Sequence, residues 1–408
     1  MNQFDVIIIG GGAAGFFAAI NMAEFNPSLK IAILEKGKSG LQKVRISGGG
    51  RCNVTHAEFI PSELVQNYPR GEKELLGPFH QFMTGNTIEW FEKRGVELKI
   101  EEDGRMFPVS NTSQTIIECF LNEIKRLGVE VFYSCTVKNL SPQGESSCLN
   151  FEIETNNDVF LVKKVLIATG SNPKMWKLMD QLGHTIVPPV PSLFTFDIED
   201  ERIIDIAGVV AKDVKVSVVG AKLISEGPLL ITHGGMSAPA ILKLSAFGAL
   251  KLAQLSYNFN IEINFVKLSI QECLDELKQI KQSQARKLVW SNAQFDLPKR
   301  LWKKLVEAAN IIDNLKWADI NKLQLEQLAK QLCQANFRVN GKSTFKEEFV
   351  TAGGVDLREI NFKTYESRVV PNLYFAGEVL NIDAVTGGFN FQNAWTGAYI
   401  AARAITET

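Results

Sequence analysis

The sequence has 408 residues, 45% of them hydrophobic, so it exceeds a typical single domain and contains enough apolar side chains for two cores. Its 44 basic and 45 acidic residues nearly cancel and form no block of one sign, so we expect no nucleic-acid partner. There is no uninterrupted apolar run of about 18 residues, and the glycine-interrupted N-terminus does not resemble a secretion signal, so we expect a cytoplasmic protein without a membrane partner.

The first elements form a strand, a glycine-rich turn and a helix. An apolar strand at residues 4–9 leads into Gly10-x-Gly12-x-x-Gly15, and an apolar helix is predicted over residues 12–24. In dinucleotide-binding folds the first glycine turns the chain, the second lets the backbone approach a pyrophosphate, and the third lets the helix pack on the strand. The helix N-terminus then faces the phosphates. A structural turn without a ligand is the alternative interpretation.

A second strand favours the nucleotide-binding interpretation. A largely apolar strand is predicted over residues 30–34 and ends on Glu35, about 20 positions after Gly15. A carboxylate at this place accepts hydrogen bonds from an adenosine ribose and repels a 2′-phosphate. The pattern therefore predicts a Rossmann unit that binds an adenine dinucleotide.

The rest of the chain predicts two kinds of architecture. Strands are expected at residues 129–133, 150–155 and 165–169, with helices at 85–94 and 112–127. After a proline-dense crossing at residues 187–191, strands are expected at 214–219, 229–232 and 262–268 and helices at 270–283, 299–309 and 322–335. A strand at 370–378 and a helix at 390–405 return to the first pattern. We predict an α/β fold in which residues 1–186 and 346–408 form one Rossmann-type domain. Residues 187–345 form an inserted α+β domain, with a small sheet or barrel plus helices.

Further glycine-rich segments favour FAD over a nicotinamide cofactor. Residues 43–53, Lys-Val-Arg-Ile-Ser-Gly-Gly-Gly-Arg-Cys-Asn, follow Glu35 and offer Lys43, Arg45 and Arg51 as charge partners. A late strand ends in the turn Ala168-Thr-Gly170. Near the C-terminus, Ala376-Gly-Glu378 places a carboxylate for ribityl hydroxyls, and Gly387-Gly388 precede a helix whose N-terminus would face the flavin.

Five segments carry motifs of one known family. They are Ser47–Asn53 with Thr55, Thr232-His-Gly-Gly-Met-Ser-Ala-Pro239, Val350-Thr-Ala-Gly-Gly-Val355, Glu366-Ser367, and Gly377-Glu378 with Thr386-Gly-Gly-Phe-Asn390. Together they resemble the BaiN/YhiN-like (aminoacetone oxidase-like) FAD-dependent flavoproteins, and the resemblance spans nearly the whole chain. Met236, Ala238 and Asn381 stand where the family usually has Leu, Gly and Asp. The first two are interpreted as conservative packing changes, and Asn381 removes a charge.

The resemblance implies a two-part FAD domain of the glutathione-reductase type, with the inserted domain over the flavin. Together with the motifs it implies cofactor contacts at Gly10, Gly12, Ala13, Ala14, Gly15, Glu35, Lys36, Lys43, Arg45, Ser47, Gly48, Gly49, Gly50, Asn53, Val137, Ala168, Thr169, Gly170, Gly377, Glu378, Asp383, Gly387, Gly388, Asn390 and Phe391. The implied activity is hydride transfer between flavin and a small enone, carbonyl or amine. NAD(P)H is a possible transient donor, because the insertion has no second G-x-G-x-x-G after a strand.

Three residues are candidates for chemistry. His233 lies between a predicted strand and two glycines in the insertion, and its pKa range suits proton transfer to a substrate held at the junction of the two domains. Arg51 is expected opposite it, as a contact for substrate or phosphate. Cys52 is adjacent to Arg51, which is expected to lower the pKa of its thiol. A purely structural His233 is the alternative.

The remaining residue patterns exclude other classes. The six cysteines include no C-x-x-C, which predicts no disulfide-redox pair, zinc site or iron–sulfur ligands: Cys52, Cys119, Cys135, Cys148, Cys273 and Cys333. No Ser-His-Asp arrangement or metal-ligand spacing is visible, so a metal site is not expected. An RNA-modifying flavoenzyme related to tRNA-modifying proteins and a non-catalytic flavin-binding regulator remain as alternative functions.

Overall fold

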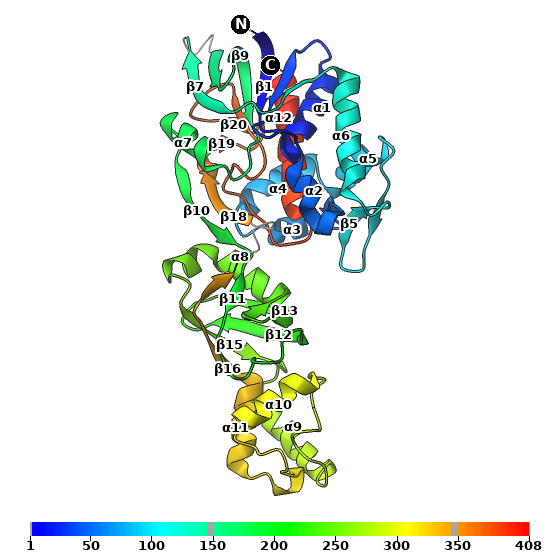
Figure 1. The fold of residues 1–408 in the computed structure, drawn as a ribbon, viewed down its shortest axis with the longest axis vertical. Helices are drawn as coiled ribbons and strands as arrows, with labels where there is room; N and C mark the ends of the chain where they lie inside the picture. Colours follow the sequence, from blue (N-terminus) through cyan, green and yellow to red (C-terminus); the bar gives the residue numbers. More distant parts are fainter. Residues whose placement is uncertain (1, 145–149, 344–349, 408) are drawn as a thin grey trace. The chain divides into compact units, whose positions relative to one another are not determined.

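The computed structural model describes residues 2–144, 150–343 and 350–407 and divides the chain into two compact units (Figure 1). Unit 1 consists of Met1–Pro189 and Thr351–Thr408, and unit 2 consists of Val190–Val350. Cys148 and the expected boundary between residues 345 and 346 lie outside the described residues. Within the described ranges, no helix is long and apolar enough to cross a membrane.

A largely parallel sheet forms the centre of unit 1, with the strand order β19-β20-β21-β9-β1-β2-β6. Neighbouring strands from β21 to β6 run parallel, and β21 from the C-terminal segment pairs with β9 through Leu373 and Val165. The two segments therefore share one Rossmann-type sheet, which confirms the predicted fold class. The strands are β1 (Asn2–Ile9), β2 (Ile31–Leu34), β6 (Glu130–Phe132), β9 (Val159–Ile167), β19 (Ile360–Asn361), β20 (Glu366–Ser367) and β21 (Leu373–Phe375).

β9 begins earlier than the strand predicted at residues 165–169. Its first half pairs antiparallel with β8 (Asn150–Thr155), and β8 pairs with β7 (Val137–Gln143). In that half the buried Phe160 and Val162 alternate with more exposed residues, whereas Val165–Ile167 are all buried. The apolar run that begins at residue 165 therefore corresponds only to the end of β9, where both faces of the sheet are buried.

Helices from both ends of the chain pack together in unit 1. α1 (Ala13–Phe25) contacts α12 (Phe389–Glu407) and α6 (Ser113–Leu127). The ring centroid of the fully buried Phe17 lies 4.5 Å from that of Trp90 and 5.2 Å from that of Trp395. This aromatic cluster fixes α1 against α12. The other elements are α2 (Gln42–Gly50), α3 (Pro61–Leu64), α4 (Glu72–Gln81), α5 (Thr84–Glu92), α7 (Pro173–Gln181), η1 (Val65–Asn67), η4 (Leu357–Glu359), and the small sheet of β3 (Thr55–His56), β5 (Arg105–Pro108) and β4 (Leu98–Ile100).

Unit 2 combines an antiparallel sheet with a group of helices. Its strand order is β16-β15-β12-β13-β14-β11-β17. α8 packs on β13 and β12, while the fully buried Trp302 and Trp317 lie among the helices. The strands are β11 (Thr195–Asp197), β12 (Val210–Val218), β13 (Ile224–Ile231), β14 (Gly235–Ser237), β15 (Phe259–Asn264), β16 (Ala335–Val339) and β17 (Gly341–Ser343), and the helices are α8 (Pro239–Gln254), α9 (Ile270–Ser283), α10 (Lys299–Ala308), η3 (Trp317–Asp319) and α11 (Lys322–Cys333).

Several predicted boundaries differ from the structure for local reasons. The strand expected at residues 262–268 ends at Asn264, because the Asn264 side-chain oxygen accepts hydrogen bonds from the N–H groups of Val266 and Lys267 and turns the chain. The proline-dense crossing is itself a strand, β10 (Ile186–Ser192), which pairs with β18 (Val350–Val355). Prolines are compatible with this two-stranded ladder, because each strand has an outer edge whose N–H groups bond to no other strand.

Candidate functional site

Gly10 and Gly15 hold the first strand, turn and helix in close contact. Gly10 has φ +112°, and a Cβ there would lie 2.4 Å from the carbonyl oxygen of Ala168. A Cβ on Gly15 would lie 2.0 Å from the carbonyl oxygen of Gly10. Both glycines are therefore required by the protein's own packing, at the carboxyl ends of β1 and β9.

Gly12 is different because no protein atom fills the space beside it. A Cβ on Gly12 would lie 4.0 Å from the oxygen of Ala168, which is an ordinary van der Waals distance. Gly12 is also the N-cap of α1, and it provides no side-chain cap for the helix. The first turn thus offers N–H groups next to an open space, which is the arrangement that binds a pyrophosphate. The residues present fit the phosphates of a dinucleotide.

Glu35 lies beside this turn. Its Oε2 accepts a hydrogen bond of 2.8 Å from the N–H of Gly11, and its Oε1 accepts one of 2.6 Å from the N–H of Gly37. These bonds fix the carboxylate at the end of β2, and each oxygen keeps a lone pair for a ribose hydroxyl. Lys36 is exposed next to it, and Val137 begins β7.

The second glycine-rich segment, expected as a loop, begins as a helix. α2 is interrupted at Ser47, where ψ is 149°, and Gly48, Gly49 and Gly50 have φ of 57°, 68° and 82°. A Cβ on Gly49 or Gly50 would have no atom within 4 Å. Leu41, which precedes α2, donates its N–H to the oxygen of Gly11 at 2.8 Å. The second segment is thereby attached to the first glycine turn.

Residues of the C-terminal segment also lie beside the first turn of α1. A Cβ on Gly377 would lie 3.5 Å from the Cβ of Ala14 in the first turn of α1. Glu378 forms an ion pair with Lys43, and a Cβ on Gly170 would lie 3.7 Å from the Glu378 carboxylate. The structure therefore brings together residues that are more than 200 positions apart in the sequence and that were all predicted as cofactor contacts.

His56 of β3 lies against the start of α12, and it was not predicted as a site residue. Its ring stacks on Phe389 with centroids 4.5 Å apart, and its Nδ1 lies 3.0 Å from the oxygen of Gly387. A Cβ on Gly388 would lie 2.5 Å from the oxygen of Thr55. The position of His56 three residues after Asn53, in the glycine-rich segment, is the sequence signal that could have indicated it.

Other predicted contacts already have partners within the protein. The Arg51 guanidinium bonds to Glu101 at 2.6 Å and lies 3.9 Å from the centre of the Phe107 ring. Asp383 is fully buried and forms an ion pair with Arg70. The remaining predicted residues in this group bond or stack as follows: Arg45 with Gln114, Asn390 with the backbone of Ala384, and Phe391 with Trp395. Asn381 accepts a hydrogen bond from the N–H of Gly353, so its amide attaches the segment after Glu378 to β18.

The expectation for Cys52 is wrong. Its side chain is fully buried, and burial raises the pKa of the thiol to about 12 instead of lowering it. The adjacent Arg51 points to Glu101, so it does not supply the positive charge that would stabilise a thiolate.

His233 lies at the tip of the β13–β14 turn in unit 2 and is exposed. Gly235, expected to permit close approach of the flavin, is needed inside unit 2, since a Cβ there would lie 1.9 Å from the oxygen of Phe196. Gly234 has no atom within 4 Å of the corresponding position. Ala238 has φ +78° and ψ 177°, so replacing the family's glycine is a backbone change and not a conservative packing change.

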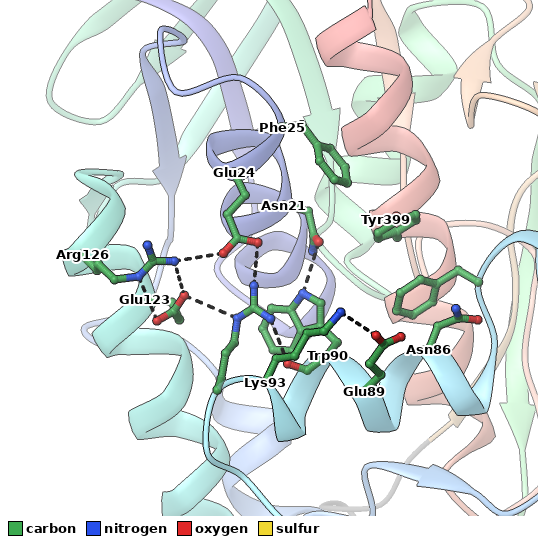
Figure 2. A pocket seen from close by; sticks show the side chains of 12 residues that line it. Asn21, Glu24, Phe25, Asn86, Glu89, Trp90, Lys93, Glu123, Arg126 and Tyr399 are labelled. Atoms are coloured by element: carbon green, nitrogen blue, oxygen red, sulfur yellow. Dashed lines mark hydrogen bonds and ion pairs between the residues drawn. The ribbon is translucent and has the colours of Figure 1, made fainter.

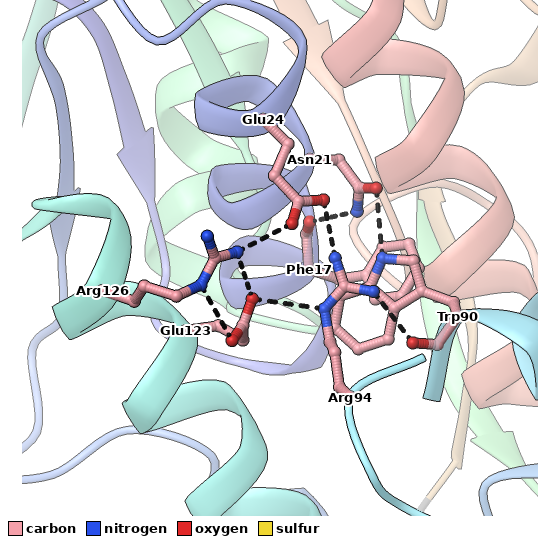
Figure 3. Close-up of polar contacts among 7 residues, drawn as sticks. All are labelled: Phe17, Asn21, Glu24, Trp90, Arg94, Glu123 and Arg126. Carbon is pink, nitrogen blue, oxygen red and sulfur yellow. Dashed lines mark hydrogen bonds and ion pairs between the residues drawn. The ribbon is translucent and has the colours of Figure 1, made fainter. Parts of the chain in front are cut away.

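A pocket of about 460 Å³ lies elsewhere in unit 1, at the other end of α1 from Gly12 (Figure 2). It is lined by Asn21, Glu24 and Phe25 of α1, with Trp90 from α5 and Tyr399 from α12 among the others. Four charged side chains beside it form a closed ring of ion pairs, which Figure 3 shows: Glu24–Arg94, Arg94–Glu123, Glu123–Arg126 and Arg126–Glu24. This ring joins α1 to α6, and it does not include the predicted cofactor residues.

The parallel sheet, the open space at Gly12 and the nearby carboxylates of Glu35 and Glu378 define a Rossmann-type dinucleotide-binding domain. The chain belongs to the HI0933-like protein Rossmann domain family, whose model matches residues 4–404. The resemblance to BaiN/YhiN-like flavoproteins is thereby confirmed, and so is the expected enzyme class, the FAD-dependent oxidoreductases.

Two curated relatives match the whole length. The chain is 29% identical over 418 residues to the ribosomal RNA dihydrouridine synthase of Haemophilus influenzae, covering 100% of both chains. It is 28% identical over 425 residues to the 3-dehydro-bile acid delta(4,6)-reductase of Clostridium scindens, covering 98% of both. The solved 3-ketosteroid delta1-dehydrogenase of Sterolibacterium denitrificans has the same fold, with a TM-score of 0.52, 11% identity and full coverage of both chains.

Proposed function

We propose that this flavoprotein transfers a hydride between its FAD and a carbon–carbon double bond conjugated to a carbonyl group. The observation that carries the proposal is the similar full-length identity to two relatives whose names describe saturation of such a bond. The bond lies in the uracil ring in one case and in a bile-acid ketone in the other. FAD supplies the hydride chemistry when bound, so the residues of this chain have to hold the cofactor, position the substrate and handle one proton.

Cofactor binding is assigned to the residues around Gly12. The α1 N-terminus and Gly12 take the pyrophosphate, Glu35 takes the adenosine ribose, and Glu378 with Lys43 lies where ribityl hydroxyls need polar partners. Asn381 replaces the family's usual carboxylate and bonds to Gly353, which supports a positioning role and no proton transfer there.

His233 is the proposed residue for protonating or orienting the substrate. It is exposed, and its ring makes no hydrogen bond within the described part of the chain, so it is free to bond a ligand. Arg51 is proposed as a contact for an anionic or carbonyl oxygen, with Glu101 and Phe107 fixing its guanidinium. The proposed electron donor is NAD(P)H bound transiently, since the pairings between the strands of unit 2 are antiparallel and unlike a second dinucleotide-binding sheet.

The substrate is proposed to be a small enone, and uridine in RNA is the second candidate. The second candidate is favoured by the relative with 29% identity that acts on ribosomal RNA. Against it stands the nearly balanced charge of the chain, with 44 basic and 45 acidic residues.

One experiment separates these possibilities. The purified holoprotein is mixed anaerobically with NADPH or NADH and then with a 4-en-3-one steroid, with aminoacetone, or with an unmodified ribosomal RNA fragment. Flavin absorbance and the product mass are followed. Reoxidation of the flavin with gain of two hydrogens on the steroid supports the small-enone proposal, and the same gain on uridine supports RNA. Turnover of aminoacetone alone, or no flavin reduction by any donor, contradicts the proposal.

The role of His233 is tested by His233→Ala, with His80→Ala as the control because His80 is also exposed. We expect His233→Ala to keep its FAD and lose at least about tenfold in the rate of flavin reoxidation, as removal of a general acid does. Equal rates for both variants mean that His233 is not used in the reaction.

A further inference from the structure

Two cysteines that are 60 positions apart in the sequence come together inside unit 2. Cys273 lies in the first turn of α9, and Cys333 is the last residue of α11. α9 packs against α11, and both thiols belong to the same apolar core. The sequence spacing excluded a C-x-x-C pair, but it carried no information about this contact.

One backbone carbonyl fixes the position of both residues. Ser269, the N-cap of α9, accepts a hydrogen bond of 3.0 Å from the N–H of Cys273 and one of 3.8 Å from the thiol of Cys333. This shared carbonyl brings Cys333 next to the first turn of α9, and the pKa of each thiol is shifted chiefly by the other thiol, in agreement with that contact. Each cysteine is a free thiol in this structure.

We propose that Cys273 and Cys333 form a redox-modification site, in which a low-molecular-weight disulfide oxidises the pair to a disulfide that joins α9 to α11. The Cys333 thiolate attacks one sulfur of the reagent, whose S–S bond breaks and releases one thiol. The Cys273 thiolate then attacks the mixed disulfide on Cys333 and releases the second thiol. The reagent is reduced to two thiols, which take the two protons of the cysteines.

The chemistry assigns the first attack to Cys333. The neighbouring Cys273 thiol lowers the pKa of the Cys333 thiol, whereas the Cys333 thiol and burial raise the pKa of Cys273. Cys333 also ends α11, where the last helical turn opens more readily than the middle of a helix. Because Cys333 is 3% exposed and Cys273 is fully buried, the reaction requires this opening and is slower than that of an exposed thiol.

The consequence is a covalent loop of about 60 residues that contains α9, α10 and α11. A crosslink across a loop of this length restricts the unfolded chain, so the oxidised form unfolds at a higher temperature. The other described cysteines have no thiol partner recorded in the described ranges: Cys52, Cys119 and Cys135.

The test uses the full-length protein with oxidised glutathione, followed by acid quenching, alkylation under denaturing conditions and peptide mapping. We expect a linkage between the peptides that contain Cys273 and Cys333, the loss of two alkylation sites, and reversal by dithiothreitol. In the Cys273→Ala variant we expect glutathione to remain attached to Cys333, and in the control Cys135→Ala we expect the 273–333 linkage to persist.

Wild-type protein alone is sufficient to overturn the proposal if the variants fail to fold. The proposal is wrong if folded wild type keeps both thiols under conditions that crosslink urea-unfolded protein, or if the linkage joins other cysteines. It is also wrong if the oxidised and reduced forms have the same unfolding midpoint.

Discussion

A Cβ on Gly15 would lie 2.0 Å from the carbonyl oxygen of Gly10, whereas a Cβ on Gly12 would lie 4.0 Å from the carbonyl oxygen of Ala168. The three glycines of this motif therefore differ in how closely the rest of the protein packs against them. Gly10 and Gly15 are required by the fold of the protein, whereas the space beside Gly12 is open and is proposed to receive a phosphate of the cofactor.

This difference predicts opposite effects for two alanine substitutions. Gly15→Ala forces the helix away from the strand and is expected to cost about 2 kcal/mol or more of stability. Gly12→Ala meets no protein atom, so the apo-protein is expected to stay within about 1 kcal/mol of wild type while its FAD content falls strongly. Thermal unfolding of the apo-proteins and heat-released flavin measure the two quantities. Full FAD content in Gly12→Ala would contradict the assignment of that space to a phosphate.

A second prediction concerns Ala238, which adopts φ +78° and ψ 177° just before α8. This backbone region strongly favours glycine, so Ala238→Gly is expected to stabilise unit 2 by about 1 kcal/mol. The neighbouring substitution Ser237→Gly is the control and is expected to destabilise, since Ser237 lies in β14 without a positive φ. Denaturant unfolding of both variants tests the prediction, and a destabilised Ala238→Gly would contradict it.

A third prediction concerns pH and the buried His184. Its Nε2 lies 2.8 Å from the hydroxyl of Ser367, and burial lowers its pKa below 6.5. Because the unfolded chain takes up the proton first, stability is expected to fall as pH drops below about 6.5, by up to about 1.4 kcal/mol per unit. The loss of stability stops once the pH lies below the pKa of His184 in the folded protein.

The matched variant for this pH effect is His184→Gln, which keeps a hydrogen-bonding side chain. It is expected to be less stable than wild type at neutral pH and to lack the fall in stability that begins below about pH 6.5. The carboxylates with a lowered pKa, such as Glu123 and Asp356, lose their contribution only at more acid pH. Parallel pH profiles for variant and wild type would exclude His184 as the source.

A fourth prediction distinguishes the members of the charged ring. Arg94 has a side chain that is 10% exposed, bonds to Glu24 and stacks 3.7 Å from the Trp90 ring, while Arg126 is 56% exposed. Arg94→Ala is expected to cost about 2 kcal/mol, because it removes the two ion pairs of the least exposed charge in the ring together with the packing of its guanidinium on Trp90. Arg126→Ala is expected to cost less than about 1 kcal/mol. FAD content is expected to be normal in both variants, and its loss in Arg94→Ala would connect this ring to the cofactor.

The sequence predicted those parts of the site that lie close together along the chain. Gly10, Gly12, Gly15 and Glu35 belong to one strand–helix–strand unit, whose local periodicity is visible in the residues themselves. The pairing of Lys43 with Glu378 and that of Cys273 with Cys333 depend on how distant segments pack, which no local pattern encodes. The pKa of Cys52 was misjudged for the same reason, since its burial is a property of the folded chain.

The location of β21 in the parallel sheet has a consequence for synthesis on the ribosome. β21 and α12 come from residues beyond 372, yet they pair with β9 and pack against α1. All members of the apolar core of unit 2 lie between Phe194 and Val339, so that core is complete before β21 is translated. During translation one edge of β9 therefore stays unpaired until residues 373–375 have been synthesised. Termination between unit 2 and β21 would release a chain with an intact insertion and an open nucleotide-binding sheet.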